Sequence, residues 1–176
     1  MFRFCFLIFT IISFSALALP LGGYWKPGFR QSICLMEQQT DVKISSEFKL
    51  HVLASFSYMG KGYKLSEQQK IHDFKKGSHV LGFYIIRAID NMVNKVDSSL
   101  DVYVDGEKLN KSESADGQYF FVTGQKVAAV LERASRSHAF NVELKSASGK
   151  VYPVEFNNEQ LSLGTKMYFT CSKNIT

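Results

Sequence analysis

This 176-residue chain lacks the residue patterns by which most enzyme classes are recognised. No two of its four histidines frame a glutamate at the i,i+4 spacing of a zinc-peptidase helix. No serine lies in a Gly-x-Ser-x-Gly elbow, and the Gly-Lys-Gly of residues 60–62 lacks the spacing of a phosphate-binding loop. We therefore predict no metal and no cofactor, and interpret His51, His72, His79 and His138 as surface or hydrogen-bonded side chains.

A long apolar run occurs only near the N-terminus, at residues 4–17, directly after Arg3. The run is shorter than the roughly 20 residues that span a bilayer, is interrupted by two serines and ends in Ala-Leu-Ala. We expect residues 1–18 to be a signal peptide cleaved after Ala18, which leaves residues 19–176 as a single exported domain in the periplasm or outside the cell. The alternative is a retained membrane anchor.

The sequence also lacks a basic, aromatic-interleaved motif of the kind that binds nucleic acid. Its formal net charge is only +5 and its isoelectric point is about 9.0. Together with export, these features argue against nucleic acid as a partner and favour a protein or an anionic envelope component, namely a lipid, lipopolysaccharide or cell-wall polymer.

Cysteine is scarce, and two of the three cysteines follow the expected cleavage site. An oxidising compartment favours a disulfide between Cys34 and Cys171. The alternative is two free thiols, one of them a nucleophile, but neither cysteine has a recognisable catalytic signature around it.

The remainder of the chain has mostly strand patterns. Residues 48–58 alternate with period two, as a half-buried strand does, and residues 80–89 form a nearly continuous apolar run that suits a strand covered on both faces. Further strands are expected at 100–104, which leads into an Asp-Gly turn and a return through 108–109, and at 119–122.

A second hairpin is expected from strands 140–144 and 152–156, with Pro153 at a sheet edge or facing outward. Met167, Phe169 and Cys171 alternate and predict a last strand.

One helix is firmly indicated at 127–134, with Thr123 as its N-cap, and a weaker helix at 66–76. In the weaker helix a Ser-x-x-Gln capping box precedes Ile71 and Phe74, which would point inward. The expected fold is mainly β or α+β: an antiparallel sandwich or bent sheet of about eight strands with one packed helix.

Two segments are candidate contact sites. One concentrates positive charge beside aromatic side chains, and its alternative is a solvated lysine-rich loop. Its residues are Lys61, Tyr63, Lys64, Lys70, Lys75 and Lys76.

The second segment, residues 22–29, holds Tyr24, Trp25 and Phe29 in a Gly/Pro setting. It would be either an exposed aromatic loop or an N-terminal segment tucked over the sandwich. Asn110 and Asn174 begin N-glycosylation sequons, which matter only in a eukaryotic source.

The order of these segments resembles the invasion-associated locus B family of bacterial envelope proteins. The similarity lies in Trp25, the run 33–39 (Ile-Cys-Leu-Met-Glu-Gln-Gln), the run 102–106 (Val-Tyr-Val-Asp-Gly), the helix through Val130 and the strand at 140–144. The resemblance implies an exported β-rich single domain that is linked to host-cell invasion and has no known catalytic centre. The family typically has further cysteines in its middle segment, whereas residues 111–122 have none, and no functional residue is carried over.

Two functions follow as hypotheses. The first is a secreted or periplasmic non-enzymatic binding protein, such as an envelope, virulence or inhibitor factor. The second is a small secreted hydrolase of cell-wall or glycan material, which needs two carboxylates, or a histidine and a carboxylate, converging in a pocket.

Overall fold

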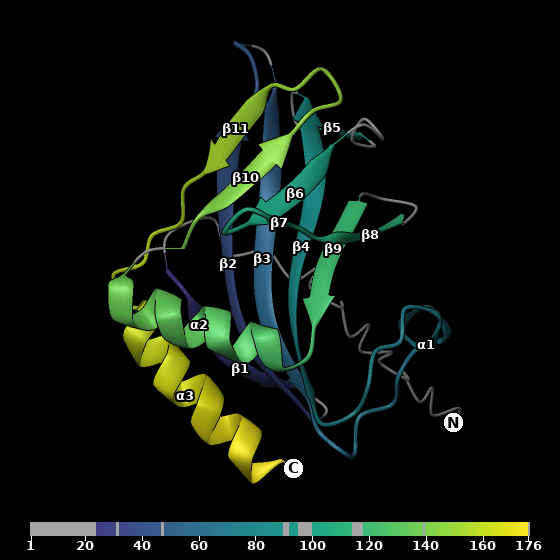
Figure 1. Ribbon diagram of the computed structural model, residues 1–176, viewed down its shortest axis with the longest axis vertical. Coiled ribbons are helices and arrows are strands. Elements are labelled where there is room, and N and C mark those ends of the chain that lie inside the picture. The colour runs from purple at the N-terminus through teal and green to yellow at the C-terminus, as the bar shows by residue number, and fades with distance from the viewer. Residues whose placement is uncertain are drawn as a thin grey trace, which may run out of the picture.

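The computed structural model describes residues 24–30, 32–46, 48–89, 92–94, 100–113, 118–138 and 140–175 (Figure 1). The expected signal peptide lies outside these residues. Two antiparallel sheets form a sandwich-like, mainly β fold, and Figure 1 shows the smaller sheet in front of the larger one. The predicted fold class is confirmed.

The larger sheet has seven strands in the order β1-β2-β3-β4-β9-β8, with β5 paired to β4. Its strands are β1 (Lys26–Arg30), β2 (Ile33–Lys43), β3 (Lys49–Met59), β4 (Ser78–Ile89), β5 (Met92–Asn94), β8 (Asn110–Glu113) and β9 (Gln118–Thr123). The smaller sheet has the order β11-β10-β6-β7. Its strands are β6 (Asp101–Val104), β7 (Glu107–Lys108), β10 (Val142–Lys145) and β11 (Val151–Val154).

The described residues thus contain eleven strands, more than the expected eight or so. The additional strands include β1, all of whose residues are exposed. A strand that buries nothing has no apolar alternation, and for this reason the sequence pattern did not indicate β1.

The main core lies between the two sheets. Alternation in β3 turns Val52, Ala54 and Phe56 inward, and all three are fully buried. Val102 of β6 and Leu144 of β10 belong to the same buried cluster from the opposite sheet. Burial of each large apolar side chain stabilises the fold by about 1.5–3 kcal/mol.

Both predicted hairpins are present. Asp105 and Gly106 adopt positive φ angles between β6 and β7, as a type I′ turn requires. In the second hairpin Pro153 lies on β11, which pairs only with β10 and is therefore a sheet edge, where a missing N–H donor is tolerated.

The firm helix is α2 (Gln125–Ser137), which buries Val127, Leu131 and Ala134. Its N-cap is Gly124 and not the expected Thr123, because Thr123 is still paired in β9.

The weaker helix shortens to α1 (Glu67–Ile71), with the predicted capping box of Ser66 and Gln69. Phe74 is buried, as expected, but Ile71 is 78% exposed, and its predicted inward position is wrong. The helix ends before Phe74, and the following turn carries Phe74 to the sheet, so the two side chains do not share a helix face.

The predicted last strand is wrong, because residues 161–174 form the helix α3 (Leu161–Asn174). Its buried positions have helical spacing but are mostly small or polar, and for this reason the apolar residues alone suggested a strand. The buried positions are Leu161, Gly164, Thr165, Tyr168 and Ser172. Gly164 lets the helix approach β2, since a Cβ there would lie 2.9 Å from the Met36 sulfur.

Candidate functional site

The predicted lysine-rich segment is the connection between β3 and β4, residues 60–77, which folds over the outer face of the larger sheet. This face points away from the smaller sheet. Phe74 packs there against Met59, Val80 and Phe121, and Tyr63 is packed against the same cluster. The expectation that β4 is covered on both faces holds at Val80, where this connection covers the outer face, whereas Tyr84 and Ile86 on the same face are only half-buried.

The structure brings the five predicted lysines together on this one connection, and all five are exposed. Lys70 pairs with Glu67 at 2.6 Å and Lys75 with Asp73 at 3.3 Å. Within the described part of the chain, the other three lysines have no ion-pair partner; they are Lys61, Lys64 and Lys76. Tyr63 is half-buried and donates a 3.3 Å hydrogen bond to Gln69 Oε1, so its hydroxyl serves the loop itself.

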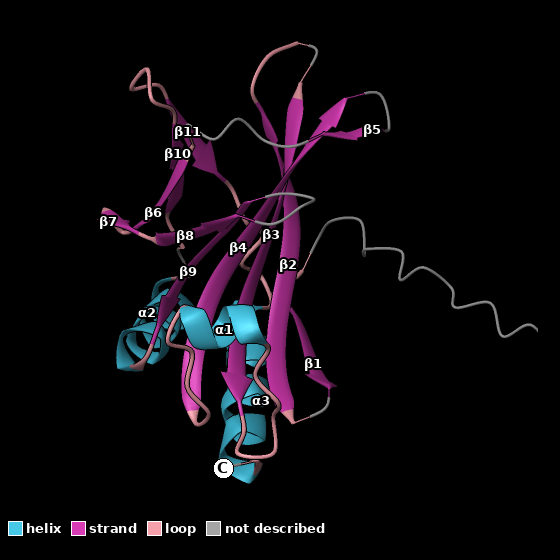
Figure 2. Cartoon of the chain, turned by 90° about the vertical axis from the view of Figure 1, so that its right-hand side faces the viewer, coloured by secondary structure: helices cyan, strands magenta, loops and turns pink. Residues whose placement is uncertain are grey.

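Three regions of the chain meet at the end of the molecule where the C-terminus lies (Figure 2). The backbone N–H of Gly60 donates to the carbonyl of Ser32, between β1 and β2, at 2.9 Å, and that of Gly77 donates to Met59 at 2.6 Å. A Cβ on Gly60 would lie 2.5 Å from the carbonyl oxygen of Ile175, just after α3. The β1–β2 connection, both ends of the segment 60–77 and the C-terminal end of α3 are therefore adjacent.

We define the basic end as residues 26–30, 60–77 and 166–175. It holds nine Lys and Arg residues and two acidic residues. The cations are Lys26, Arg30, Lys61, Lys64, Lys70, Lys75, Lys76, Lys166 and Lys173, and the anions are Glu67 and Asp73. The whole chain has 21 Lys and Arg residues and 16 Asp and Glu residues. Outside the basic end there are therefore 12 basic and 14 acidic residues, so the remainder of the chain is slightly acidic. Sequence reasoning missed the contributions of Arg30 and Lys173, because both are isolated cations far along the chain from the lysine-rich segment.

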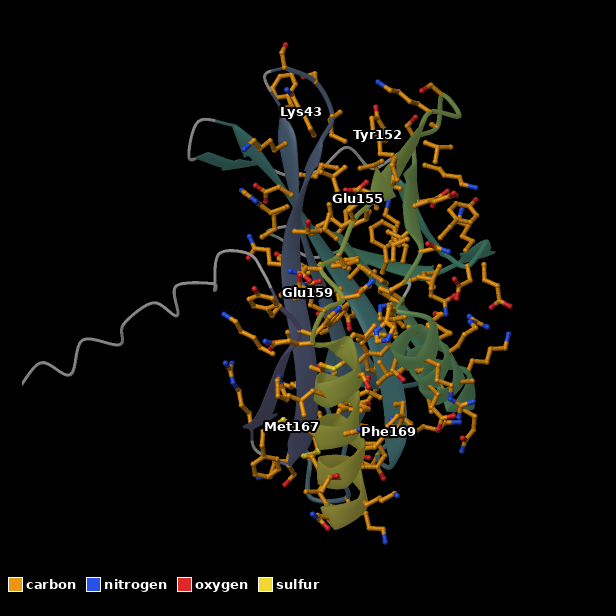
Figure 3. All side chains as sticks on the ribbon, turned by 90° about the vertical axis from the view of Figure 1, so that its left-hand side faces the viewer. Lys43, Tyr152, Glu155, Glu159, Met167 and Phe169 are labelled. Carbon is orange, nitrogen blue, oxygen red and sulfur yellow. A yellow bond between two sulfur atoms is a disulfide. The ribbon has the colours of Figure 1, made fainter. Side chains whose placement is uncertain are left out.

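Two of the residues that make up the basic end are exposed apolar side chains from β1 and α3. Phe29 on β1 is 60% exposed and lies opposite Cys34 in the β1–β2 register. Met167 is 51% exposed and lies one helical turn before Cys171. Figure 3 shows Met167 on the side of α3 that faces β1 and Phe169 on the other side. The two exposed side chains, Phe29 and Met167, therefore lie on the same flank of the molecule as the cysteines.

The other two aromatic residues of the segment 22–29, Tyr24 and Trp25, differ from Phe29 in their exposure. Trp25 is only 1% exposed, packs against Phe56 and Phe156 at centroid distances of 5.5 and 5.4 Å, and donates from Nε1 to Asn158 at 3.1 Å. Of the two expectations for this segment, the tucked arrangement therefore holds at Trp25, which is a core residue and not a surface contact. Tyr24 is 42% exposed.

Cys34 and Cys171 form the predicted disulfide, with Cα atoms 5.9 Å apart. The bond ties β2 to α3 across 137 residues of sequence. Neither sulfur is then available as a thiol nucleophile.

His79 has a structural position beneath α3. Its Nδ1 and the Tyr168 hydroxyl are hydrogen-bonded at 2.8 Å, and its ring lies 4.9 Å from that of Tyr58, between centroids, at a tilted angle. Burial lowers the pKa of His79 and raises the pKa of Tyr168, which favours the neutral form of both groups. The pair therefore anchors α3 to β4.

One pocket, of about 660 Å³, lies where β10 and β11 separate beyond the pair Val142–Val154. Three carboxylates and two amides line it, together with two phenylalanines: Asp105, Glu143, Glu155, Asn141, Asn158, Phe140 and Phe156. Asp105 is bound to Arg133, and Glu143 pairs with Lys145 at 3.2 Å. Only Glu155 has no cation beside it within the described residues.

The other polar side chains of the described residues form no second candidate site. His51 Nδ1 lies 2.6 Å from Asp41 Oδ1 on the outer sheet face, but neither residue lines the carboxylate pocket. In the residues that the structure describes, no three metal-ligating side chains are grouped closely enough to hold an ion. Of the three helices there, none combines the length and hydropathy of a membrane span. Asn110 and Asn174 are both exposed.

Comparison of the chain with protein-family models, with curated proteins and with solved structures gives no match.

Proposed function

We propose that this is an exported, non-enzymatic binding protein that docks through its basic end on an anionic component of the cell envelope. The observation that supports the proposal most strongly is the concentration of nine cations and two anions on three converging regions, in a chain that is otherwise slightly acidic. The disulfide agrees with export, since such bonds persist in oxidising compartments.

The physical basis is electrostatic attraction supplemented by direct ion pairing. Exposed lysines that already pair within the protein gain little from a new partner, because each new contact replaces an existing one. Lys61, Lys64 and Lys76 have no such competing partner among the residues that the structure describes, so they contribute their full attraction to an external anion. Such attraction weakens as salt screens it, with a Debye length of about 8 Å at physiological ionic strength.

The second candidate, a secreted glycan hydrolase, draws on the carboxylate pocket. A glycosidase needs one carboxyl group to protonate the leaving oxygen and a second to act as base or nucleophile. Asp105 and Glu143 each form an ion pair with a basic side chain of the protein, so neither carboxylate is free to contact a substrate without breaking that pair. We therefore place the hydrolase second to the binding protein.

Titration of the mature chain, residues 19–176, with inorganic polyphosphate tests the proposal by calorimetry. Binding should weaken steadily as salt is raised. The triple variant K61Q/K64Q/K76Q should bind at least about tenfold more weakly, since one lysine near an anionic surface contributes about 1 kcal/mol.

The matched control is K43Q/K49Q/K150Q, which removes the same charge. Figure 3 shows Lys43 at the far end of the molecule, and Lys49 and Lys150 lie beside the turns of the β2–β3 and β10–β11 hairpins. The control should bind within about twofold of the wild type if the effect is local, because charges beyond a Debye length are largely screened. Equal losses in the two variants, or no binding at all, would contradict docking through the basic end.

A further inference from the structure

We propose that the anionic component is the headgroup layer of a lipid membrane, with Phe29 inserted among the lipids beside the cations of the basic end. This inference rests on the proposed function and adds the class of partner and the apolar anchor.

The position of Phe29 carries the inference. Phe29 is the most exposed aromatic side chain of the described residues, at 60%, and the cation Arg30 follows it directly. Ser32, next along the described chain, contacts Gly60 and Gly62 on either side of Lys61. Because neighbouring strand residues point to opposite faces, Phe29 lies on the Cys34 face of β1, and Arg30, opposite Ile33, lies on the outer face with the segment 60–77. The β1 edge therefore presents an apolar ring on one face and cations on the other. Such a ring gains nothing from water or from a hydrophilic polymer, whereas a headgroup layer offers this edge both phosphates and acyl chains.

Met167 extends the same apolar flank from α3. It is half exposed and lies on the β1 side of the helix (Figure 3). Its unbranched thioether side chain adapts to irregular apolar surroundings. The flank therefore combines two apolar side chains from different elements, and the disulfide ties α3 to β2, the strand with which β1 pairs.

Charge argues against a second copy of this chain as the occupant. Pairing two β1 edges would bring Lys26 and Arg30 of each copy against the same cations of the other, because both lie on this five-residue strand. Like charges at an interface are repulsive, and no acidic residue lies on β1 to offset them.

An added peptide strand is also disfavoured. The open edge of β1 contains Pro27, which has no backbone N–H to donate to a new ladder. A flat anionic layer needs no such ladder, and this edge is compatible with it.

Sedimentation with vesicles tests the inference on the mature chain with its disulfide intact. The protein should bind vesicles of phosphatidylcholine mixed with phosphatidylglycerol and should not bind phosphatidylcholine alone. K61Q/K64Q/K76Q should reduce the partition coefficient by roughly a hundredfold. Phe29→Ser should reduce it about tenfold, since burial of an aromatic side chain is lost.

Val151→Ser is the matched control, because Val151 is another exposed apolar residue on an edge strand, in the other sheet, and its loss should leave the partition coefficient unchanged. A Phe29→Trp variant reports insertion directly: brominated lipids should quench the new tryptophan, whereas Trp25 is buried in the core.

The outcomes separate the inference from the proposed function. If polyphosphate binds with the expected lysine dependence and vesicles do not bind, the docking function stands and the lipid assignment is wrong. If vesicles bind but neither Phe29→Ser nor brominated lipid has an effect, insertion is refuted. If neither ligand binds, both proposals fail.

Discussion

Removal of the Cys34–Cys171 disulfide should lower the free energy of unfolding by several kcal/mol. The bond closes a loop of 137 residues. In the chain-entropy relation a loop of that length restricts the unfolded chain by roughly 17 cal/mol/K, which is about 5 kcal/mol at 25 °C. Residual structure in the unfolded chain reduces this figure, so we expect a loss of about 3–5 kcal/mol.

Urea unfolding of the oxidised protein and of C34A/C171A measures the loss. Trp25 is the only tryptophan, and its carbonyl lies against Gly164 of α3, so its fluorescence reports on this region of the core. With a slope of about 1–3 kcal/mol/M in urea, the midpoint should fall by about 2 M. The reduced wild-type protein is the control for the two alanines and should unfold at the midpoint of the variant.

An unchanged midpoint would refute this reasoning. The structure also predicts where the loss acts first. The face of α3 that packs on the sheet includes Gly164, Thr165 and Ser172, which bury little apolar area, so the helix depends on the covalent bond. Amide hydrogens of α3 should exchange sooner than those of β3 in C34A/C171A.

Two further predictions concern single residues. Trp25→Ala should lower the free energy of unfolding by about 3–5 kcal/mol, whereas Tyr24→Ala should change it by less than about 0.5 kcal/mol, because only the first side chain is buried; urea titration checks both. The second concerns pH: burial lowers the pKa of His79, so the unfolded chain takes up a proton at a pH where the folded chain does not. The contribution of His79 is therefore fully present above about pH 6.5 and is lost as the pH falls toward its folded pKa. Urea midpoints between pH 7.5 and 5 should show this decline in wild type and in the control His138→Gln, whose ring is exposed, and a smaller decline in His79→Gln; equal declines in all three would contradict it.

The parts of the fold that could be predicted from the sequence are those defined by local patterns. The period-two alternation of residues 48–58 predicted β3, because one face of that strand packs in the core and the other does not. Asp105 and Gly106 predicted their turn, because few residues adopt positive φ without strain. The order of strands within each sheet is set by contacts between distant segments, which no local pattern contains.

The difference between local patterns and contacts of distant segments also explains which residues of the candidate site could be predicted. The lysines of residues 60–77 are neighbours in sequence and were recognised together. Arg30 and Met167 join them only because β1 and α3 fold to the same end, where Gly60 meets Ser32 and Ile175. Charge patterns in sequence therefore identified part of the basic end and missed its apolar flank.

The error at α3 had a consequence for the site as well as for the fold. In a strand, Met167, Phe169 and Cys171 would share one face, and all three would pack inward or all point outward. In a helix, residues four apart share a flank and residues two apart do not, so Met167 lies with Cys171 toward β1 while Phe169 packs against His79. The disulfide partner of Cys171 lies on β2, beside Phe29 of β1. The helical period, set by small and polar buried residues, is therefore what places an exposed methionine beside an exposed phenylalanine, and the proposed lipid contact depends on that period.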